Sequence, residues 1–140
     1  MGMNIQVAIN CADPHMQADF WAEALGYTVE SDPQGIREII DAGHATLEDT
    51  TEHNGVLVWR TGSACVDPEG RRPRLYFQQV PQAKVGLNRL HLDLHFPPGE
   101  RDAQVERLTV LGATYLYEGH QGPHAWVTMA DPEGNEFCVA

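Results

Sequence analysis

The tetrapeptide Asp-Pro-Glu-Gly occurs twice in this chain, at residues 67–70 and 131–134. Aspartate at the first position, proline at the second and glycine at the fourth are typical of a type I turn. Ahead of each copy the same order of segments recurs: a strand, a helix that ends at Leu-Gly, and further strands, with one more strand after the turn. The chain is therefore predicted to contain two copies of one strand–helix–three-strand unit.

The helix of each copy has recognisable ends. In the first half Asp13 is a typical helix N-cap, Pro14 suits the first turn, and Gly26 supplies the left-handed stop. In the second half the apolar spacing predicts a helix over 102–111 that ends at Gly112. Both helices carry an apolar stripe, so each is expected to cover one face of a sheet.

The predicted strands show a residue-by-residue alternation of apolar and polar side chains, which places the two kinds on opposite faces. The clearest case is 88–95, where Leu90, Leu92 and Leu94 share one face and His91, Asp93 and His95 share the other. The strands expected on this basis and on turn signals are 4–10, 27–30, 56–61, 74–80, 90–96, 113–117, 125–130 and 135–139.

The first half is longer than the second, and the extra residues fall in 31–54. Part of this insertion has apolar residues at helical spacing, namely Ile36, Ile39, Ile40, Gly43 and Leu47. Insertions in one copy of a repeat often form lids or interface elements, and the acidic residues here would then favour neutral or cationic ligands. The alternative is a solvated connector with a short packed helix.

The composition narrows the range of partners and cellular locations that we expect. The chain has 140 residues, 9 basic against 20 acidic residues, and a formal net charge of -11. This charge repels nucleic acid and anionic membrane surfaces, so we expect neither as a partner. Three cysteines without metal-site spacing suggest no disulfide framework, and no apolar run is long enough to cross a bilayer. These features favour a cytoplasmic protein.

Three segments, CADPHMQADFWAEALGY, RLHLDL and DPEGNEFCV, together with the duplication, resemble the vicinal oxygen chelate superfamily. This superfamily holds glyoxalases, bleomycin-resistance proteins and extradiol dioxygenases, and the chain is most similar to its small glyoxalase-like proteins. The resemblance implies an α+β fold: a single domain over 1–140 built from two paired βαβββ modules, about 4–80 and 88–140. Their curved mixed sheets would surround a cleft, with the helices outside.

Metal-dependent members take their ligands from the first and last strands of each module. The resemblance places these ligands at Gln6, a residue near Gln78, His91 and Cys138. Such members usually have glutamate where Gln78 and Cys138 stand, so the negative charge that holds a divalent cation is missing and the site is expected to be degenerate. Glu136 or Asp93 shares a strand face with the expected ligands and would compensate in part. Zinc, nickel, manganese and iron are the candidate metals.

The polar strand faces supply the other candidate site residues. His91, Asp93 and Glu136 are expected to be catalytic groups that transfer protons. Aromatic and amide side chains are expected to bind the ligand, and they are Gln6, Trp59, Tyr76, Gln78, His95 and Trp126.

Three functions follow from these residues. The preferred one is a glyoxalase-like lyase or isomerase acting on a small carbonyl compound, because titratable groups gathered on one strand face are costly to bury without use. The second is a non-catalytic protein that sequesters a planar drug or other small molecule by stacking it on Trp59, Tyr76 and Trp126, with the acidic surface attracting a cationic ligand.

The third function is a metal-dependent dioxygenase, in which His91 and Asp93 would form a two-histidine-one-carboxylate triad with His120 or His124. The competing structural interpretation is that His91 only orients Gln6 or Asp93, and that His120 and His124 lie in an exposed Gly-Pro loop. In each case the expected partner is a small molecule, and the resemblance implies a homodimer.

Overall fold

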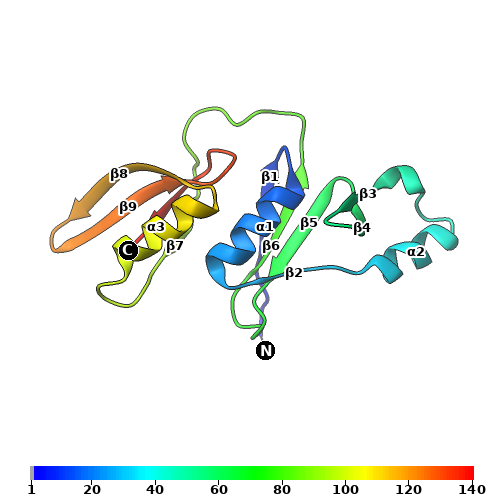
Figure 1. The fold of residues 1–140 in the computed structure, drawn as a ribbon, viewed down its shortest axis with the longest axis horizontal. Coiled ribbons are helices and arrows are strands. Elements are labelled where there is room, and N and C mark those ends of the chain that lie inside the picture. The colour runs from blue at the N-terminus through cyan, green and yellow to red at the C-terminus, as the bar shows by residue number, and fades with distance from the viewer. Residues whose placement is uncertain (1) are drawn as a thin grey trace. The chain divides into compact units, whose positions relative to one another are not determined.

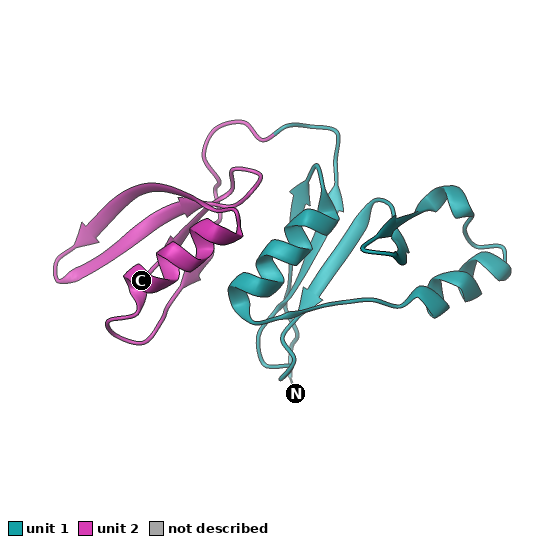
Figure 2. Cartoon of the chain, viewed as in Figure 1, with its two compact units in different colours: residues 1–83 teal, residues 84–140 magenta. Residues whose placement is uncertain are grey.

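The structure is a computed structural model that describes residues 2–140. The chain forms two compact units, one ending at Ala83 and the other beginning at Lys84 (Figure 2). Each unit contains one helix packed on one face of a four-stranded mixed sheet (Figure 1). The fold is thus α+β, with two βαβββ modules and curved mixed sheets, as the sequence predicts.

The sheet of the first unit consists of β1 (Gln6–Cys11), β2 (Thr28–Val29), β5 (Gly62–Val66) and β6 (Arg74–Gln79) in the order β1-β6-β5-β2. Strands β1 and β6 are parallel, and the other pairs are antiparallel. The first and last strands of the module are therefore neighbours, which brings the polar residues of both onto one open face.

Helix α1 (Pro14–Leu25) covers the other face of this sheet and packs on β5 and β6. The Asp13 carboxylate accepts a hydrogen bond from the Met16 N–H at 3.1 Å, and Gly26 ends the helix with φ at 69°. Both predicted helix ends are confirmed. The core between helix and sheet consists of buried side chains, chiefly Phe20, Trp21, Leu75 and Phe77.

The second unit repeats this arrangement. Its strands β7 (Asp93–Leu94), β8 (Thr114–Gln121), β9 (His124–Ala130) and β10 (Glu136–Val139) lie in the order β7-β10-β9-β8, which matches the first sheet strand for strand. Helix α3 (Arg101–Leu111) packs on this sheet. The core contains Leu108, Met129, Phe137 and Val139, each with no more than 1% of its surface exposed.

The insertion extends further along the chain than the predicted 31–54. Between β2 and β5 lie α2 (Pro33–Asp41), the short 3-10 helix η1 (Leu47–Asp49), β3 (Thr50–His53) and β4 (Val56–Trp59). Strands β3 and β4 form a separate two-stranded sheet. The predicted strand 56–61 is therefore part of the insertion, and β5, with the weak strand sequence GSACV, takes the expected place in the main sheet.

Two predicted apolar faces are partly wrong. Strand β7 has only two residues, and Leu90 is 88% exposed, while Leu94 is buried as expected. Ile39 of α2 is 41% exposed and Leu47 is 70% exposed, and Leu47 belongs to η1 because α2 already ends at Asp41. The apolar residues of the insertion thus do not form one continuous helical face.

The insertion contacts α1 through two stacked histidine rings and their hydrogen bonds. His53 of β3 lies 2.6 Å from the Asp19 carboxylate, and its ring stacks on that of His15 with the centroids 5.1 Å apart. His15 Nε2 in turn donates to the Trp59 carbonyl at 2.7 Å. These contacts hold the β3–β4 hairpin at a defined position on the first unit.

In the first Asp-Pro-Glu-Gly turn the Asp67 side chain is only 1% exposed, and its carboxylate accepts hydrogen bonds from the backbone N–H groups of Glu69, Arg71 and Arg72 at 3.0 to 3.1 Å. These hydrogen bonds hold the pKa of Asp67 at about 2, below its ordinary value of 3.8, and the bond from the Glu69 N–H has the largest effect. The turn is therefore stabilised by an ionised aspartate.

This depressed pKa predicts an acid-dependent loss of stability. The ionised Asp67 stabilises the folded chain above pH 3.8, and its contribution disappears as the pH falls towards 2. Asp67→Asn is expected to lower the melting temperature at neutral pH, with the difference from the parent shrinking in acid. The matched variant Glu69→Gln, in the same turn, should melt like the parent at both pH values. A constant difference for Asp67→Asn would contradict this assignment.

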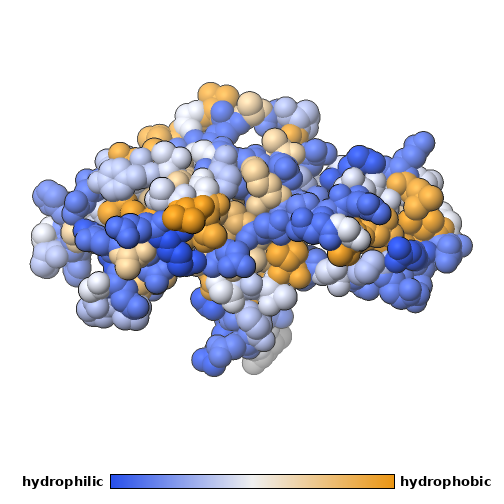
Figure 3. Space-filling view, in the orientation of Figure 1, coloured by the Kyte–Doolittle hydropathy of each residue, from blue (hydrophilic) through white to orange (hydrophobic). Residues whose placement is uncertain are grey.

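The surface agrees with the composition. On the face shown in Figure 3 most residues are hydrophilic, and hydrophobic residues appear as separate small patches. Within the described residues no helix combines the length and apolar character needed to cross a membrane.

Candidate functional site

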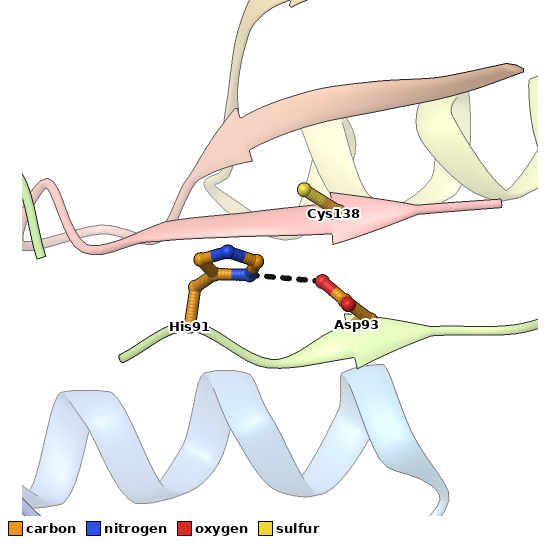
Figure 4. Close-up of side chains that lie close together, drawn as sticks. All are labelled: His91, Asp93 and Cys138. Atoms are coloured by element: carbon orange, nitrogen blue, oxygen red, sulfur yellow. Dashed lines mark hydrogen bonds and ion pairs between the residues drawn. The ribbon is translucent and has the colours of Figure 1, made fainter. Parts of the chain in front are cut away.

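Three of the predicted site residues meet on the open face of the second sheet (Figure 4). The ligand atoms of His91, Asp93 and Cys138 all lie within 4.8 Å of one another. The parallel pairing of β7 and β10 sets Asp93 beside Cys138, and His91 precedes Asp93 by two residues on the same side of the chain. The cluster is thus formed by strand pairing between residues far apart in the sequence.

His91 and Asp93 form a hydrogen-bonded pair. His91 Nδ1 lies 2.9 Å from Asp93 Oδ1, and the two side chains are 48% and 51% exposed. An ionised carboxylate only accepts hydrogen bonds, so Nδ1 carries the hydrogen in this pair. In the neutral ring the lone pair then resides on Nε2. The pair therefore presents His91 Nε2 as a proton acceptor at an accessible position.

Cys138 completes the cluster as a neutral thiol. Its Sγ lies 3.6 Å from the Thr128 hydroxyl oxygen, and burial, with a further contribution from the Asp93 charge, raises the pKa of the thiol above its ordinary value. A thiol with a raised pKa is protonated at neutral pH and is a poor nucleophile. Cys138 is therefore better suited to shape the site than to attack a substrate.

Glu136, the third predicted catalytic group, is held by other contacts. Its carboxylate receives a hydrogen bond from Lys84 Nζ at 2.8 Å and one from the Asn88 N–H at 2.8 Å. Burial of the carboxyl raises its pKa, but these two hydrogen bonds outweigh it and leave the pKa of Glu136 below its ordinary value. These contacts tie Glu136 to the segment before β7.

The remaining predicted residues of the second unit lie outside the cluster. His95 is exposed and follows β7. Trp126 lies on β9, and its ring covers Gly119, where an added Cβ would come within 2.6 Å of the ring. His120 and His124 belong to β8 and β9 rather than to a loop, and neither joins His91 and Asp93. Among the described residues the third group beside His91 and Asp93 is the Cys138 thiol and not a histidine.

The predicted residues of the first unit lie on the open face of its sheet, apart from Trp59. The Gln6 amide oxygen accepts a hydrogen bond from Arg74 Nη1 at 2.5 Å, and Arg74 also makes two hydrogen bonds with the Glu30 carboxylate, at 2.7 and 2.8 Å. Gln78 Nε2 donates to the Asn10 side chain at 3.0 Å. Both amides are thus engaged in polar networks.

The donors that the resemblance implies do not fit a divalent metal as a set. A cationic guanidinium occupies the Gln6 oxygen, an amide from Gln78 is neutral, and the Cys138 thiol keeps its proton. The groups that lie together within one unit are those of His91, Asp93 and Cys138.

Trp59 lies on β4 of the insertion and lines a cavity of about 610 Å³ together with Tyr76. Sequence reasoning did not find the Thr128 hydroxyl beside Cys138, the Arg74–Glu30 pair or the His15–His53 stack. No spacing signal links these partners, because strand register and the folding of the insertion bring them together. Only the strand-face alternation of Thr128 offered a hint.

Comparison with known proteins agrees with this fold. The family model described as a glyoxalase-like domain matches residues 6–140. A structure described as a glyoxalase/bleomycin resistance protein/dioxygenase family enzyme from Burkholderia phytofirmans PsJN superposes with a TM-score of 0.64 at 15% identity, over 96% of this chain and 94% of that chain. No curated protein matches the sequence.

Two structures of fosfomycin resistance proteins named FosX are also similar. The protein from Mesorhizobium loti gives a TM-score of 0.64 at 8% identity, over 99% of this chain and 90% of that chain. A mutant of the protein from Listeria monocytogenes, in complex with Mn(II) and 1S,2S-dihydroxypropylphosphonic acid, gives 0.61 at 11% identity, over 99% and 87%. Likeness at such low identity concerns the fold alone.

The duplicated βαβββ modules and the match of the family model over nearly the whole chain define the class of protein. The chain belongs to the glyoxalase-like domain family. The structures to which it is similar include a protein described as an enzyme and fosfomycin resistance proteins.

Proposed function

We propose that this protein is a small-molecule enzyme of the lyase or isomerase type that transfers protons through His91. The observation that carries the proposal is the 2.9 Å contact between His91 Nδ1 and Asp93 Oδ1 on an accessible sheet face. A histidine whose tautomer is held by a carboxylate is a typical general base. Its substrate would be a small carbonyl compound with a hydrogen on the carbon next to the carbonyl group.

In this reaction His91 Nε2 takes the proton from the carbon next to the carbonyl group, and the C–H electron pair moves into an enolate. The imidazolium that forms is stabilised by the Asp93 carboxylate at its other nitrogen. An isomerase returns the proton to a different atom of the same molecule. A lyase delivers it to a leaving group on the neighbouring carbon, whose bond breaks as the double bond forms.

The neutral state of Cys138 supports this division of roles. Because its pKa is raised, the thiol remains a weak hydrogen-bond donor beside the dyad and adds no second negative charge next to Asp93. A thiolate there would compete with the substrate for the imidazolium proton. The site thus has one base, His91, one carboxylate that orients it, Asp93, and one neutral thiol, Cys138.

Solvent-deuterium exchange tests the proposal even while the product is unidentified. The protein is incubated in heavy water with a panel of small ketones, aldehydes and hydroxy-carbonyl compounds, and loss of the proton signal next to the carbonyl is followed by NMR. Exchange well above the buffer rate for at least one compound is expected. If no panel compound exchanges faster with the protein than without it, the proposed carbonyl chemistry is wrong.

The expected metal content follows from the donor set. Protein purified without chelator should hold well under one equivalent of zinc, nickel, manganese or iron, and chelator should leave its melting temperature unchanged. Elemental analysis and thermal melts provide the measurement. Stoichiometric zinc that is lost in both Asp93→Asn and Cys138→Ser would contradict this expectation and would show that the three clustered side chains hold a metal.

A non-catalytic binding protein is the second candidate, because Trp59 and Tyr76 line one cavity in the first unit. Aromatic side chains around a cavity of about 610 Å³ suit a drug-sized molecule. Saturable binding without any change to the ligand would favour this function. The homodimer, the cytoplasmic location and the third alternative, a metal-dependent dioxygenase, stay predictions from the sequence.

A further inference from the structure

The cavity of the first unit lies between its sheet and the insertion. It has a volume of about 610 Å³, which is within the usual range for small-molecule sites, roughly 300 to 1,000 Å³. One side is formed by the open face of β5 and β6, and the other by α2, η1 and β4. Since the second module has no such insertion, this cavity is specific to the first unit.

The sheet side of the cavity offers an aromatic ring with a free hydroxyl. Tyr76 is paired with Ala64 on the neighbouring strand, and its ring reaches Gly62, where an added Cβ would come within 2.8 Å of the tyrosine hydroxyl oxygen. Glycine at this position therefore leaves room for the ring. The Tyr76 hydroxyl has no hydrogen-bond partner among the residues that the structure describes, so it is available to a bound molecule.

The insertion side is largely apolar. Ile36, Leu57 and Trp59 line it, and Ile36 is almost fully buried there. In Figure 3 hydrophobic residues also gather at the end of the molecule that α2 and η1 occupy in Figure 1. These side chains provide a surface for a hydrocarbon or aromatic body.

The charged groups of the cavity are unbalanced in favour of carboxylates. Glu30 is neutralised by its paired contact with Arg74. The Arg60 guanidinium is directed to the backbone carbonyls of Glu48 and Thr50, at 3.0 and 2.7 Å. In all, four carboxylates, from Glu30, Asp32, Glu48 and Asp49, face two guanidinium groups in the lining.

The Glu48 carboxylate is the least engaged of the four. Asp32 and Asp49 accept hydrogen bonds from the backbone N–H groups of Gly35 and Thr46, respectively. The Glu48 side chain has no hydrogen bond or ion pair within the described part of the chain. It is thus the charge most free to meet a cation.

We propose that this cavity binds a small organic cation, an amine with an apolar or aromatic body. The body lies against Ile36, Leu57 and Trp59, the Tyr76 hydroxyl supplies one hydrogen bond, and the ammonium group is directed to Glu48. All of these residues belong to the first unit, so the inference is independent of the proton chemistry proposed for His91.

Three probes of one shape and different charge test the ligand class: 2-phenylethylamine, 2-phenylethanol and phenylacetate. They are titrated into the intact protein by calorimetry at about pH 8, where an ordinary histidine is neutral. The amine is expected to bind with Kd of roughly 1 mM or below. We expect the alcohol to bind about tenfold more weakly than the amine, since it lacks the charge interaction, and we expect no measurable binding of phenylacetate.

Variants locate the site. Glu48→Gln should reduce amine binding severalfold and leave alcohol binding unchanged, whereas Tyr76→Phe should weaken both. Glu38→Gln removes the same charge from α2 outside the cavity and is the matched control, with amine binding as in the parent. Trp59→Phe should remove the change in tryptophan fluorescence that the amine causes, and His91→Gln should leave amine binding intact.

Three outcomes would overturn the proposal. These are equal binding of the amine and phenylacetate, no saturable binding of the amine, or equal effects of Glu48→Gln and Glu38→Gln. Loss of amine binding in His91→Gln would show that the amine binds at the second unit and would also overturn the proposal. None of these results bears on deuterium exchange, so the two proposals fail separately.

Discussion

His91→Gln is expected to lower the rate of the exchange reaction by about a hundredfold to ten-thousandfold, because that is the usual contribution of a positioned general base. Glutamine keeps a polar side chain of similar size but has no nitrogen lone pair to accept a proton. The side chain is half exposed, so the free energy of unfolding should stay close to that of the parent. The rate is measured by NMR exchange and the stability by thermal melts.

Asp93→Asn is the companion variant. An asparagine amide can donate to His91 Nδ1, which favours the tautomer with the hydrogen on Nε2 and removes the base from the site. A loss of about tenfold or more is expected, smaller than for His91→Gln, because the exposed ring still samples both tautomers. If Asp93→Asn keeps the full rate while His91→Gln loses it, the carboxylate has no orienting role. If both keep it, His91 is not the base.

Phe137→Ala is expected to destabilise the protein by about 3 to 5 kcal/mol, which is the usual cost of removing a buried aromatic side chain. Phe137 is 1% exposed and belongs to the core between α3 and the second sheet. Its neighbour Cys138 points to the opposite face of the same strand. The matched variant Cys138→Ala should cost far less.

Urea titrations of both variants measure this difference and test the assignment of the strand faces. A larger loss for Cys138→Ala than for Phe137→Ala would show that the faces of β10 are reversed. It would also remove Cys138 from the open face and with it the three-residue cluster.

The repeat, both helices and the order of segments were predictable because they depend on local signals. Asp13, Pro14 and Gly26 define the ends of α1 through backbone hydrogen bonds and dihedral preferences within a few residues. The Asp67 turn is likewise a local network. Family resemblance and residue pattern agreed on the α+β class for this reason.

Other features had no local signal. Strand β5 is rich in small residues and reads poorly as a strand, yet it lies in the centre of a sheet because β6 and β2 pair with its two edges. Val56–Trp59 has the better strand sequence, but in the part of the chain that the structure describes it pairs with β3 in a separate two-stranded sheet. Pairing with available neighbours outweighed intrinsic propensity in both cases.

The candidate site likewise combines features that local sequence signals predict with features that depend on contacts between distant segments. Alternation along 88–95 was sufficient to place His91 and Asp93 on one face, because side-chain direction in an extended chain depends only on position. The engagement of Glu136 with Lys84, the contact of Cys138 with Thr128 and the cavity under the insertion depend on strand register and on how distant segments fold against each other. Those contacts join residues far apart in the chain, so no local sequence pattern encodes them. They determine the surroundings of each predicted group, and with them its chemical role in the proposed site.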